Sequence, residues 1–408
     1  MKKILALVVM ILSLTRCTND RSIPNGYELF ERDNKDGLAQ PITLLPLRVG
    51  CYWSLQPAGD KTNLLLGSGN SSQSFVIFGC ENLAKADSGA ELVSAKLALR
   101  SSFHMGEATP FTVTAHRVAA EWAESSVLWQ DVKDSYQADP VETFEFTPRD
   151  TTWHIIPMTN LAFMKEWISD AHQSSQDIHG LLLKFERASG GSILASSEAT
   201  LYPPYFEIVT RADDSSLDTT TAKLSHDASL VLNGTNVPPE TLENDPATLR
   251  IGNGSGYRSL LLFDLAQIPR EATIHQALLT FKTDRAEIYV PDASVGVTFS
   301  VAARALVDSS WTPTSIAIDS SASAAVDVAS GTDDSFAFDS ASPVQSVSQI
   351  VQRWVSEIAP NYGLMIYPYY QNSDFQEMAF MSGVADANSA PTLVITYSLP
   401  PAHRFAQP

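Results

Sequence analysis

Residues 60–78 read DKTNLLLGSGNSSQSFVIF, and residues 245–263 read DPATLRIGNGSGYRSLLLF. The two stretches share aspartate, leucine, two glycines, serine and phenylalanine in the same register and without a gap. A sequence that repeats at a long period consists of tandem copies of one structural unit. Because the unit here is roughly 170–185 residues long, it has the size of a domain.

Further blocks repeat in the same order outside these two stretches, and gaps of a few residues between them fall where loops are expected. The paired blocks begin at Ala95 and Ala277, Trp122 and Trp311, Trp167 and Trp354, Gly180 and Gly363, and Pro204 and Pro391. An ordered series of this length indicates duplication. We therefore expect the two halves to superpose, with Phe78 on Phe263 and Trp167 on Trp354.

The apolar pattern of each copy is that of short strands and one helix. Apolar stretches such as 206–210 and 392–397 alternate with clusters of Gly, Ser, Asn and Asp, which is typical of antiparallel β-sandwiches. In the second copy Val347, Val351 and Trp354 fall on one face of a helical pattern. The sequence predicts an all-β fold of two tandem antiparallel β-sandwich domains, each with one short helix.

Several strings resemble the DNRLRE-type domain, which is similar to the family 96 carbohydrate-binding modules. They are RSLLLFDL at 258–265, ATIHQALL at 272–279, QRW at 352–354, NYGLM at 361–365 and, in the first copy, WAESSVLW at 122–129. The match covers about Asp227 to Tyr397, whereas the first copy has Gly79 and Cys80 where the family has Asp-Leu. The resemblance implies jelly-roll-like sandwiches of the kind found on exported and cell-surface bacterial proteins.

Polar stretches set the expected domain boundaries. The segment TRADDSSLDTTT at 210–221 has no apolar periodicity, so it is expected to be a linker. The stretch 320–342, rich in Ser, Ala and Asp, is expected to be a long loop. The predicted organisation is a first sandwich at 41–210, a linker at 211–222, a second sandwich at 223–398 and a tail at 399–408.

The chain begins like an export signal. Lys2 and Lys3 precede an apolar run at 4–14, which is too short to cross a bilayer and has the length of a signal-peptide core. The following LTRC at 14–17 resembles a bacterial lipobox, with Arg16 where the pattern has a small residue.

We expect a signal peptide over 1–17, lipidation of Cys17 and a polar tether over 18–40. Such a protein would be exported and lipid-anchored at the outer membrane or cell surface, and would touch the membrane only through its anchor. A plain secretory signal is the alternative.

Charge and motifs exclude several classes of function. The net charge of −19 disfavours nucleic acid and direct contact with anionic lipid. The sequence contains no nucleophile-elbow, zinc-protease, Walker or dinucleotide-binding motif. We expect no enzymatic activity, no catalytic residue and no cofactor.

The remaining cysteines, Cys51 and Cys80, flank the first repeated strand block. An oxidising compartment permits a disulfide between them. Two buried free thiols are the alternative.

Two tyrosines form the candidate glycan platform. When Gly180 is aligned with Gly363, Tyr367 and Tyr369 take the places of Lys184 and Glu186, on the strand face opposite the core. Exposed aromatic pairs hold sugar rings in many sandwich modules. The alternative is that the stretch 320–342 covers the tyrosines.

Acidic residues in that stretch could contribute to a calcium site, since calcium takes several oxygen ligands. They are Asp319, Asp327, Asp333, Asp334 and Asp339. Their spacing matches no known ligand pattern, so a solvated acidic loop is the competing interpretation and the metal content stays open.

Two functions fit these observations. The first is a lipoprotein whose sandwiches bind polysaccharide without catalysis. The second is a structural or adhesive surface lipoprotein that contacts other proteins and has no glycan ligand.

Overall fold

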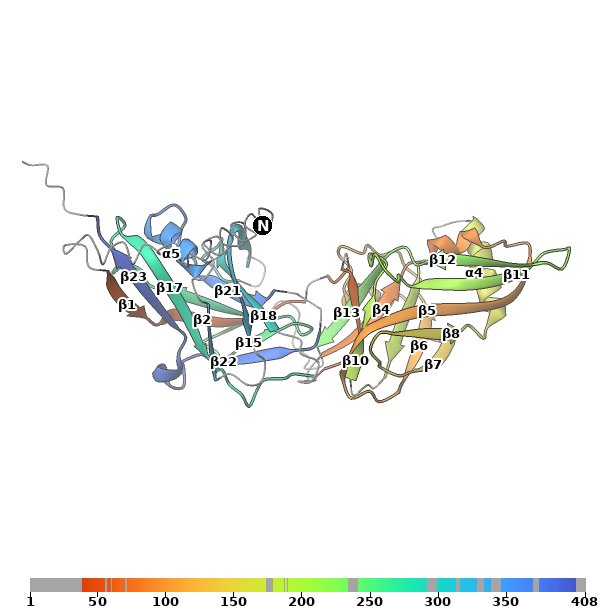
Figure 1. Cartoon of the computed structure of the whole chain (residues 1–408), viewed down its shortest axis with the longest axis horizontal. Helices are drawn as coiled ribbons and strands as arrows, with labels where there is room; N and C mark the ends of the chain where they lie inside the picture. Colours follow the sequence, from red (N-terminus) through yellow and green to blue (C-terminus); the bar gives the residue numbers. More distant parts are fainter. Residues whose placement is uncertain are drawn as a thin grey trace, which may run out of the picture.

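The computed structural model has two halves that lie end to end along the long axis of the molecule (Figure 1). It describes residues 39–400 apart from 56, 60, 70–71, 174–178, 187, 189, 234–240, 292–298, 313–315, 329–333, 339–345 and 370–373. Within these residues no helix has the length and apolar character needed to span a bilayer. The predicted all-β, antiparallel character is confirmed, and the helices are few and short.

One half, which we call the N-half, contains the strands β3 (Asn63–Ser68), β4 (Ser72–Phe78), β5 (Glu91–Gly106), β6 (Phe111–Arg117), β7 (Glu142–Phe146), β8 (Thr152–Pro157), β9 (Leu181–Phe185), β10 (Gly190–Ala195), β11 (Tyr205–Arg211), β12 (Leu217–Lys223) and β13 (Asp227–Asn233). They form a curled sheet in the order β12-β11-β5-β10-β3-β4-β9-β6-β7, with β13 paired to β4 and β8 to β5. Its helices are η1 (Glu81–Lys85), α3 (Trp129–Val132) and α4 (Leu161–Gln173).

The other half, the C-half, contains β14 (Thr241–Asn244), β15 (Thr248–Gly252), β16 (Tyr257–Phe263), β17 (Thr273–Lys282), β18 (Phe299–Leu306), β19 (Ile318–Val328), β20 (Ser335–Phe338), β21 (Leu364–Pro368), β22 (Glu377–Met381), β23 (Thr392–Ser398), α5 (Val347–Val355) and η4 (Ala387–Ser389). The first strands of the chain, β1 (Gln40–Leu44) and β2 (Pro46–Trp53), also belong to it. Its sheets have the orders β14-β2-β16-β21-β18-β19, β1-β23-β17-β20 and β15-β22.

The two halves share one strand order. β12-β11-β5-β8 corresponds to β1-β23-β17-β20, β13-β4-β9-β6-β7 corresponds to β2-β16-β21-β18-β19, and β3-β10 corresponds to β15-β22. Phe78 and Phe263 end the equivalent strands β4 and β16, and both are buried. Trp167 and Trp354 are buried on the equivalent helices α4 and α5. The predicted duplication therefore extends to the order of the strands.

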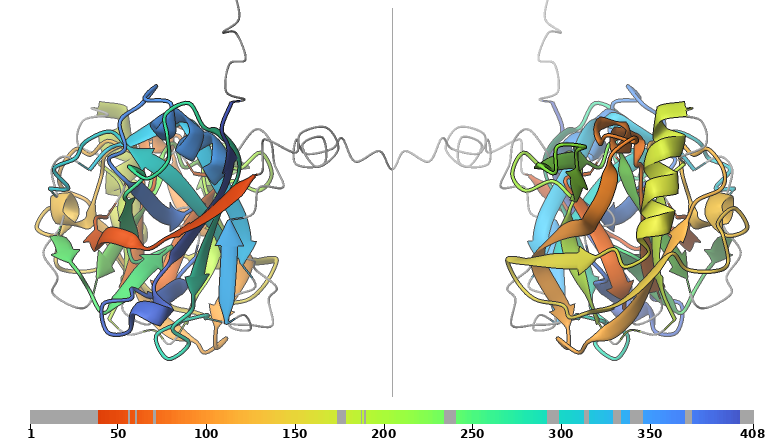
Figure 2. Two further views of the ribbon diagram at one scale, coloured as in Figure 1. Left: turned by 90° about the vertical axis from the view of Figure 1, so that its left-hand side faces the viewer. Right: turned by 90° about the vertical axis from the view of Figure 1, so that its right-hand side faces the viewer.

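The N-terminal strands close the C-half. β1 pairs with β23, with Gln40 opposite Tyr397, and β2 pairs with β16. In the N-half the equivalent places are filled by β12 on β11 and β13 on β4. Figure 1 and the left view of Figure 2 show the red N-terminal strands beside the blue C-terminal ones.

This pairing corrects the predicted boundaries. Residues 40–53 belong with the C-half, and residues 217–233 belong with the N-half. The predicted linker at 211–222 is instead the hairpin from β11 to β12, closed by a bond from the backbone N–H of Ala212 to the carbonyl of Ser216. Because this hairpin follows β11 directly, it occupies the N-half edge at little loss of chain entropy. The first strands of the chain then pair with the edges that remain open in the C-half.

The stretch 320–342 also differs from its prediction. Its described residues form most of β19, which pairs with β18, and β20, which pairs with β17. Small Ser and Ala side chains dominate β19 and hide its strand character, since they give no clear apolar alternation.

Each half has its own apolar core, and a smaller cluster joins the two halves. That cluster contains Leu65, Met105 and Ile193 of the N-half with Phe375 of the C-half. A Cβ added at Gly69 of the N-half would lie 2.5 Å from the Cβ of Phe375. This glycine thus permits the close contact, and the chain itself crosses between the halves twice, from β2 to β3 and from β13 to β14.

Candidate functional site

The candidate site is a hollow of about 720 Å³ on the outer face of the N-half sheet. Strand alternation explains the part of its lining that β6 provides, because alternate residues of a strand point to opposite faces. The lining residues are Thr112, Thr114 and His116 of β6, Lys184, Phe185 and Glu186 at the end of β9, and Tyr136, Ala138 and Pro140 of the segment before β7. Val113 and Ala115, which lie between the β6 residues, are buried in the core.

The ammonium group of Lys184 lies within an aromatic cage beside the hollow. It donates a hydrogen bond to the hydroxyl of Tyr136 and lies 4.2 Å from the centroid of that ring. It is also 5.6 Å from the ring of Trp129 and 5.9 Å from that of Phe75. Cation–π attraction therefore holds the charge in one place.

His116 contributes a neutral polar group. Its Nδ1 bonds to the backbone carbonyl of Gln137 at 2.9 Å, and a carbonyl can only accept, so Nδ1 carries the proton. Its Nε2 then accepts from the hydroxyl of Thr114, also at 2.9 Å. Burial, aided by the charge of Lys184, lowers the pKa of His116, which keeps the ring neutral at physiological pH.

The predicted tyrosine platform lies on the matching face of the C-half, but only one of its two tyrosines is exposed. Tyr369 is exposed, with 47% of its surface accessible, whereas Tyr367 is buried at 4%. The prediction is therefore wrong for Tyr367. Trp311 and Ile316, of the segment that leads into β19, pack in the same cluster as Tyr367. None of the described residues of the stretch 320–342, which the sequence offered as the alternative cover, belongs to that cluster.

Two arginine side chains also lie on this C-half face. Arg258 is buried, lies opposite Tyr52 across the β2–β16 pair, and donates from Nη1 to the carbonyl of Ser54 at 2.9 Å. Burial lowers its pKa to about 10. The guanidinium of Arg304 lies 6.0 Å from the ring of Tyr367. The face that is hollow in the N-half is thus packed in the C-half.

The repeated tryptophans have a structural role. Trp122 donates from Nε1 to the carbonyl of His179 at 2.5 Å, and Trp311 donates to the carbonyl of Tyr362 at 2.8 Å. In both halves the accepting residue directly precedes the repeated glycine. The bond fixes the loop at the start of β9 or β21.

The disulfide prediction is wrong. Cys51 lies on β2 in the C-half and Cys80 follows β4 in the N-half, and both are free and buried. The exchange of N-terminal strands separates two cysteines that are close in sequence. Two buried free thiols, the alternative interpretation, are what the structure has.

We expect these thiols to be unreactive in the native protein. Burial raises the pKa of Cys51 to about 12 and raises that of Cys80 as well, so the nucleophilic thiolate is scarce. Alkylation at pH 8 followed by peptide mass spectrometry should leave both unlabelled until the protein is denatured. A peptide that joins Cys51 to Cys80 would contradict this expectation.

The acidic residues that were predicted as a possible calcium site do not lie together. Asp319 pairs with Arg353 at 3.3 Å and Asp334 with Arg285 at 2.9 Å, on separate elements. Ser300 donates to Asp327 at 2.5 Å. The described residues of the acidic stretch therefore form no common cation site. Cys17, Asp333, Asp339, the signal peptide, most of the tether and most of the tail lie outside the described residues.

Sequence reasoning missed the hollow, although a signal was present. The alternation of β6, which places Thr112, Thr114 and His116 on one face, marks a polar strand surface. The sequence did not indicate that residues 136–140 lie beside this surface and line the hollow. No family model matches the chain, and no curated protein matches it.

Proposed function

We propose that this protein is an exported, lipid-anchored envelope protein with two tandem jelly-roll-like β-sandwiches, whose N-half binds polysaccharide without catalysis. The observation that carries the proposal is the hollow over β6 and β9. Ligand sites combine concave shape with a few fixed polar groups and aromatic surface. The hollow has these features in Thr112, Lys184 and the ring of Tyr136.

The charge of the hollow favours a neutral glycan. Lys184 and Glu186 offset each other, and His116 is neutral. The chain as a whole carries −19 and repels acidic polymers. Among the described residues that line the hollow, Glu186 is the only carboxylate, whereas most glycosidases use two. These features support binding rather than hydrolysis.

A glycan array followed by affinity measurements tests the proposal. The double variant Lys184→Met and Glu186→Gln keeps the size of both side chains, removes both charges and removes the hydrogen-bond donor of Lys184. Because each lost hydrogen bond to a charged group is worth about 1.5–3 kcal/mol, we expect at least a tenfold loss of affinity for any neutral glycan that binds. Because Lys184 also contacts the rings of Tyr136 and Trp129, the melting temperature should fall by a few degrees, and affinity is measured well below it.

Tyr369→Ala is the matched control, since Tyr369 occupies the place of Glu186 on the C-half. It should leave glycan affinity unchanged. If instead Tyr369→Ala removes binding and the double variant retains it, the site is on the C-half. An array without any bound glycan would favour the structural or adhesive lipoprotein.

A further inference from the structure

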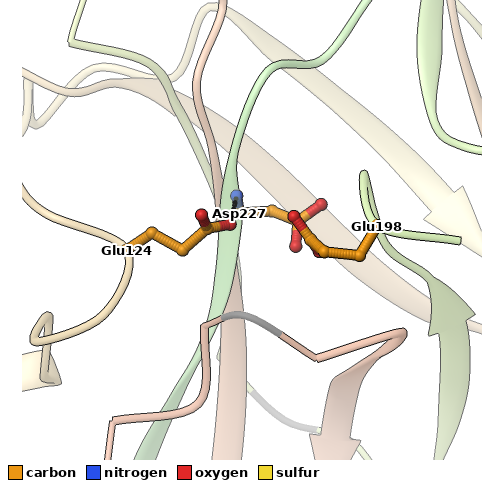
Figure 3. A group of neighbouring side chains, drawn as sticks. All are labelled: Glu124, Glu198 and Asp227. Carbon is orange, nitrogen blue, oxygen red and sulfur yellow. Dashed lines mark hydrogen bonds between the residues drawn. The ribbon is translucent and has the colours of Figure 1, made fainter.

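Three carboxylates from distant segments meet at one corner of the N-half (Figure 3). Glu124 comes from the segment between β6 and α3, Glu198 from the turn after β10, and Asp227 is the first residue of β13. One oxygen of each lies within 4.8 Å of the others.

The carboxylate of Asp227 is buried and only half satisfied. None of its surface is exposed. Its Oδ2 accepts from the backbone N–H of Ser197 at 2.6 Å, but its Oδ1 has no hydrogen-bond partner among the described residues. A buried polar atom without a partner is costly. Oδ1 therefore marks a place where a ligand is needed.

The surroundings of Asp227 are negative. The charges that act on it are those of Glu198 and Glu124. A bound cation would be attracted by these carboxylates and would complete the bonds of Oδ1.

We propose that this corner binds calcium, with Glu124, Glu198 and Asp227 as ligands. Oxygen atoms that share one calcium ion lie about 2.4 Å from it, so no two of them are more than about 4.8 Å apart. The spacing of the three carboxylates meets this limit. The group consists of oxygen donors, which calcium prefers, whereas zinc sites are built mainly from His and Cys.

The bound ion would secure the strand that completes the N-half. Asp227 begins β13, and its backbone N–H already donates to Glu124 at 2.8 Å. In the C-half, Pro46 of β2 lies opposite Phe263 as Asp227 lies opposite Phe78. Proline brings no carboxylate to that corner. A cation therefore favours β13 over β2 as the partner of β4.

Calorimetric titration of the full chain with calcium, after chelator treatment, tests the proposal. We expect one site per chain and a higher melting temperature of the N-half when calcium is present. Glu198→Gln, at an exposed position, and Asp227→Asn should each weaken calcium binding at least tenfold. Asp218→Asn, which removes an exposed charge from β12 in the same half, is the control and should bind as the wild type does.

Two further readouts make the outcome clear. Terbium, which replaces calcium and is excited through nearby indoles, should luminesce on tryptophan excitation, since Trp122 contacts His226 beside Asp227, and should lose that signal in Glu198→Gln. Absence of heat and of a thermal shift at millimolar calcium would overturn the proposal. So would full calcium affinity in both ligand variants, or binding of magnesium with no response to calcium.

Discussion

A chain that begins at residue 54 will keep a folded N-half and lose the folded C-half. Without β1 and β2, the strands β23 and β16 each lose one of their two antiparallel partners, and β14 loses the strand it pairs with. The deletion also removes the buried side chains of Val49, Tyr52 and Trp53. Each contributes roughly 1.5–3 kcal/mol by burial, so the loss is on the order of 5–10 kcal/mol, as large as the whole stability of many domains.

Three fragments test this expectation. Residues 57–233 alone should unfold cooperatively, because every strand of the N-half lies within them. Residues 241–400 alone should be open to proteolysis, and a peptide of residues 39–53 added in trans should protect them. A chain that begins at residue 39 is the control. Cooperative unfolding of residues 241–400 without the peptide would show that the exchange is dispensable.

The second large effect is expected at the repeated glycines. Gly180 has a φ of 129°, and an added Cβ would lie 2.0 Å from the carbonyl oxygen of Phe78. Gly363 has a φ of 102°, with the carbonyl oxygen of Leu261 at 2.6 Å. Because the backbone is strained for alanine and the neighbouring strand cannot yield, Gly→Ala at either site should cost about 3 kcal/mol or more.

Each substitution should destabilise only the half of the molecule that contains it. Denaturant unfolding followed by hydrogen exchange should show Gly180→Ala weakening the N-half and Gly363→Ala the C-half. Gly89→Ala is the matched control, since the nearest atom to its added Cβ is 3.4 Å away, and it should change stability little. Equal effects at Gly89 and Gly180 would refute the steric argument.

Local repetition made much of the fold predictable. The blocks at Trp122 and Gly180 recur because a tryptophan N–H and a glycine are both needed to fix one loop. The helices are predictable because Trp167 and Trp354 each lie on an apolar face. These features depend on residues within one copy.

Features that depend on both copies were not predictable. The consecutive strands β1 and β2 fit places equivalent to those of β12 and β13, so the apolar pattern does not say which copy each pair completes. The burial of Tyr367 depends on a segment some 50 residues earlier that carries Trp311. Likewise, Glu124, Glu198 and Asp227 meet only after three distant segments have been placed.

The pairing of the N-terminal strands β1 and β2 with the C-half has a mechanical consequence. If the chain is anchored through Cys17, the C-half lies next to the membrane and the N-half projects outward, which reverses their order in the sequence. A polymer that pulls on the N-half then loads β2 along its axis, between the anchor and β3. The hydrogen bonds of β2 to β14 and β16 resist together in shear, so the exchanged strand serves as a force-bearing clamp.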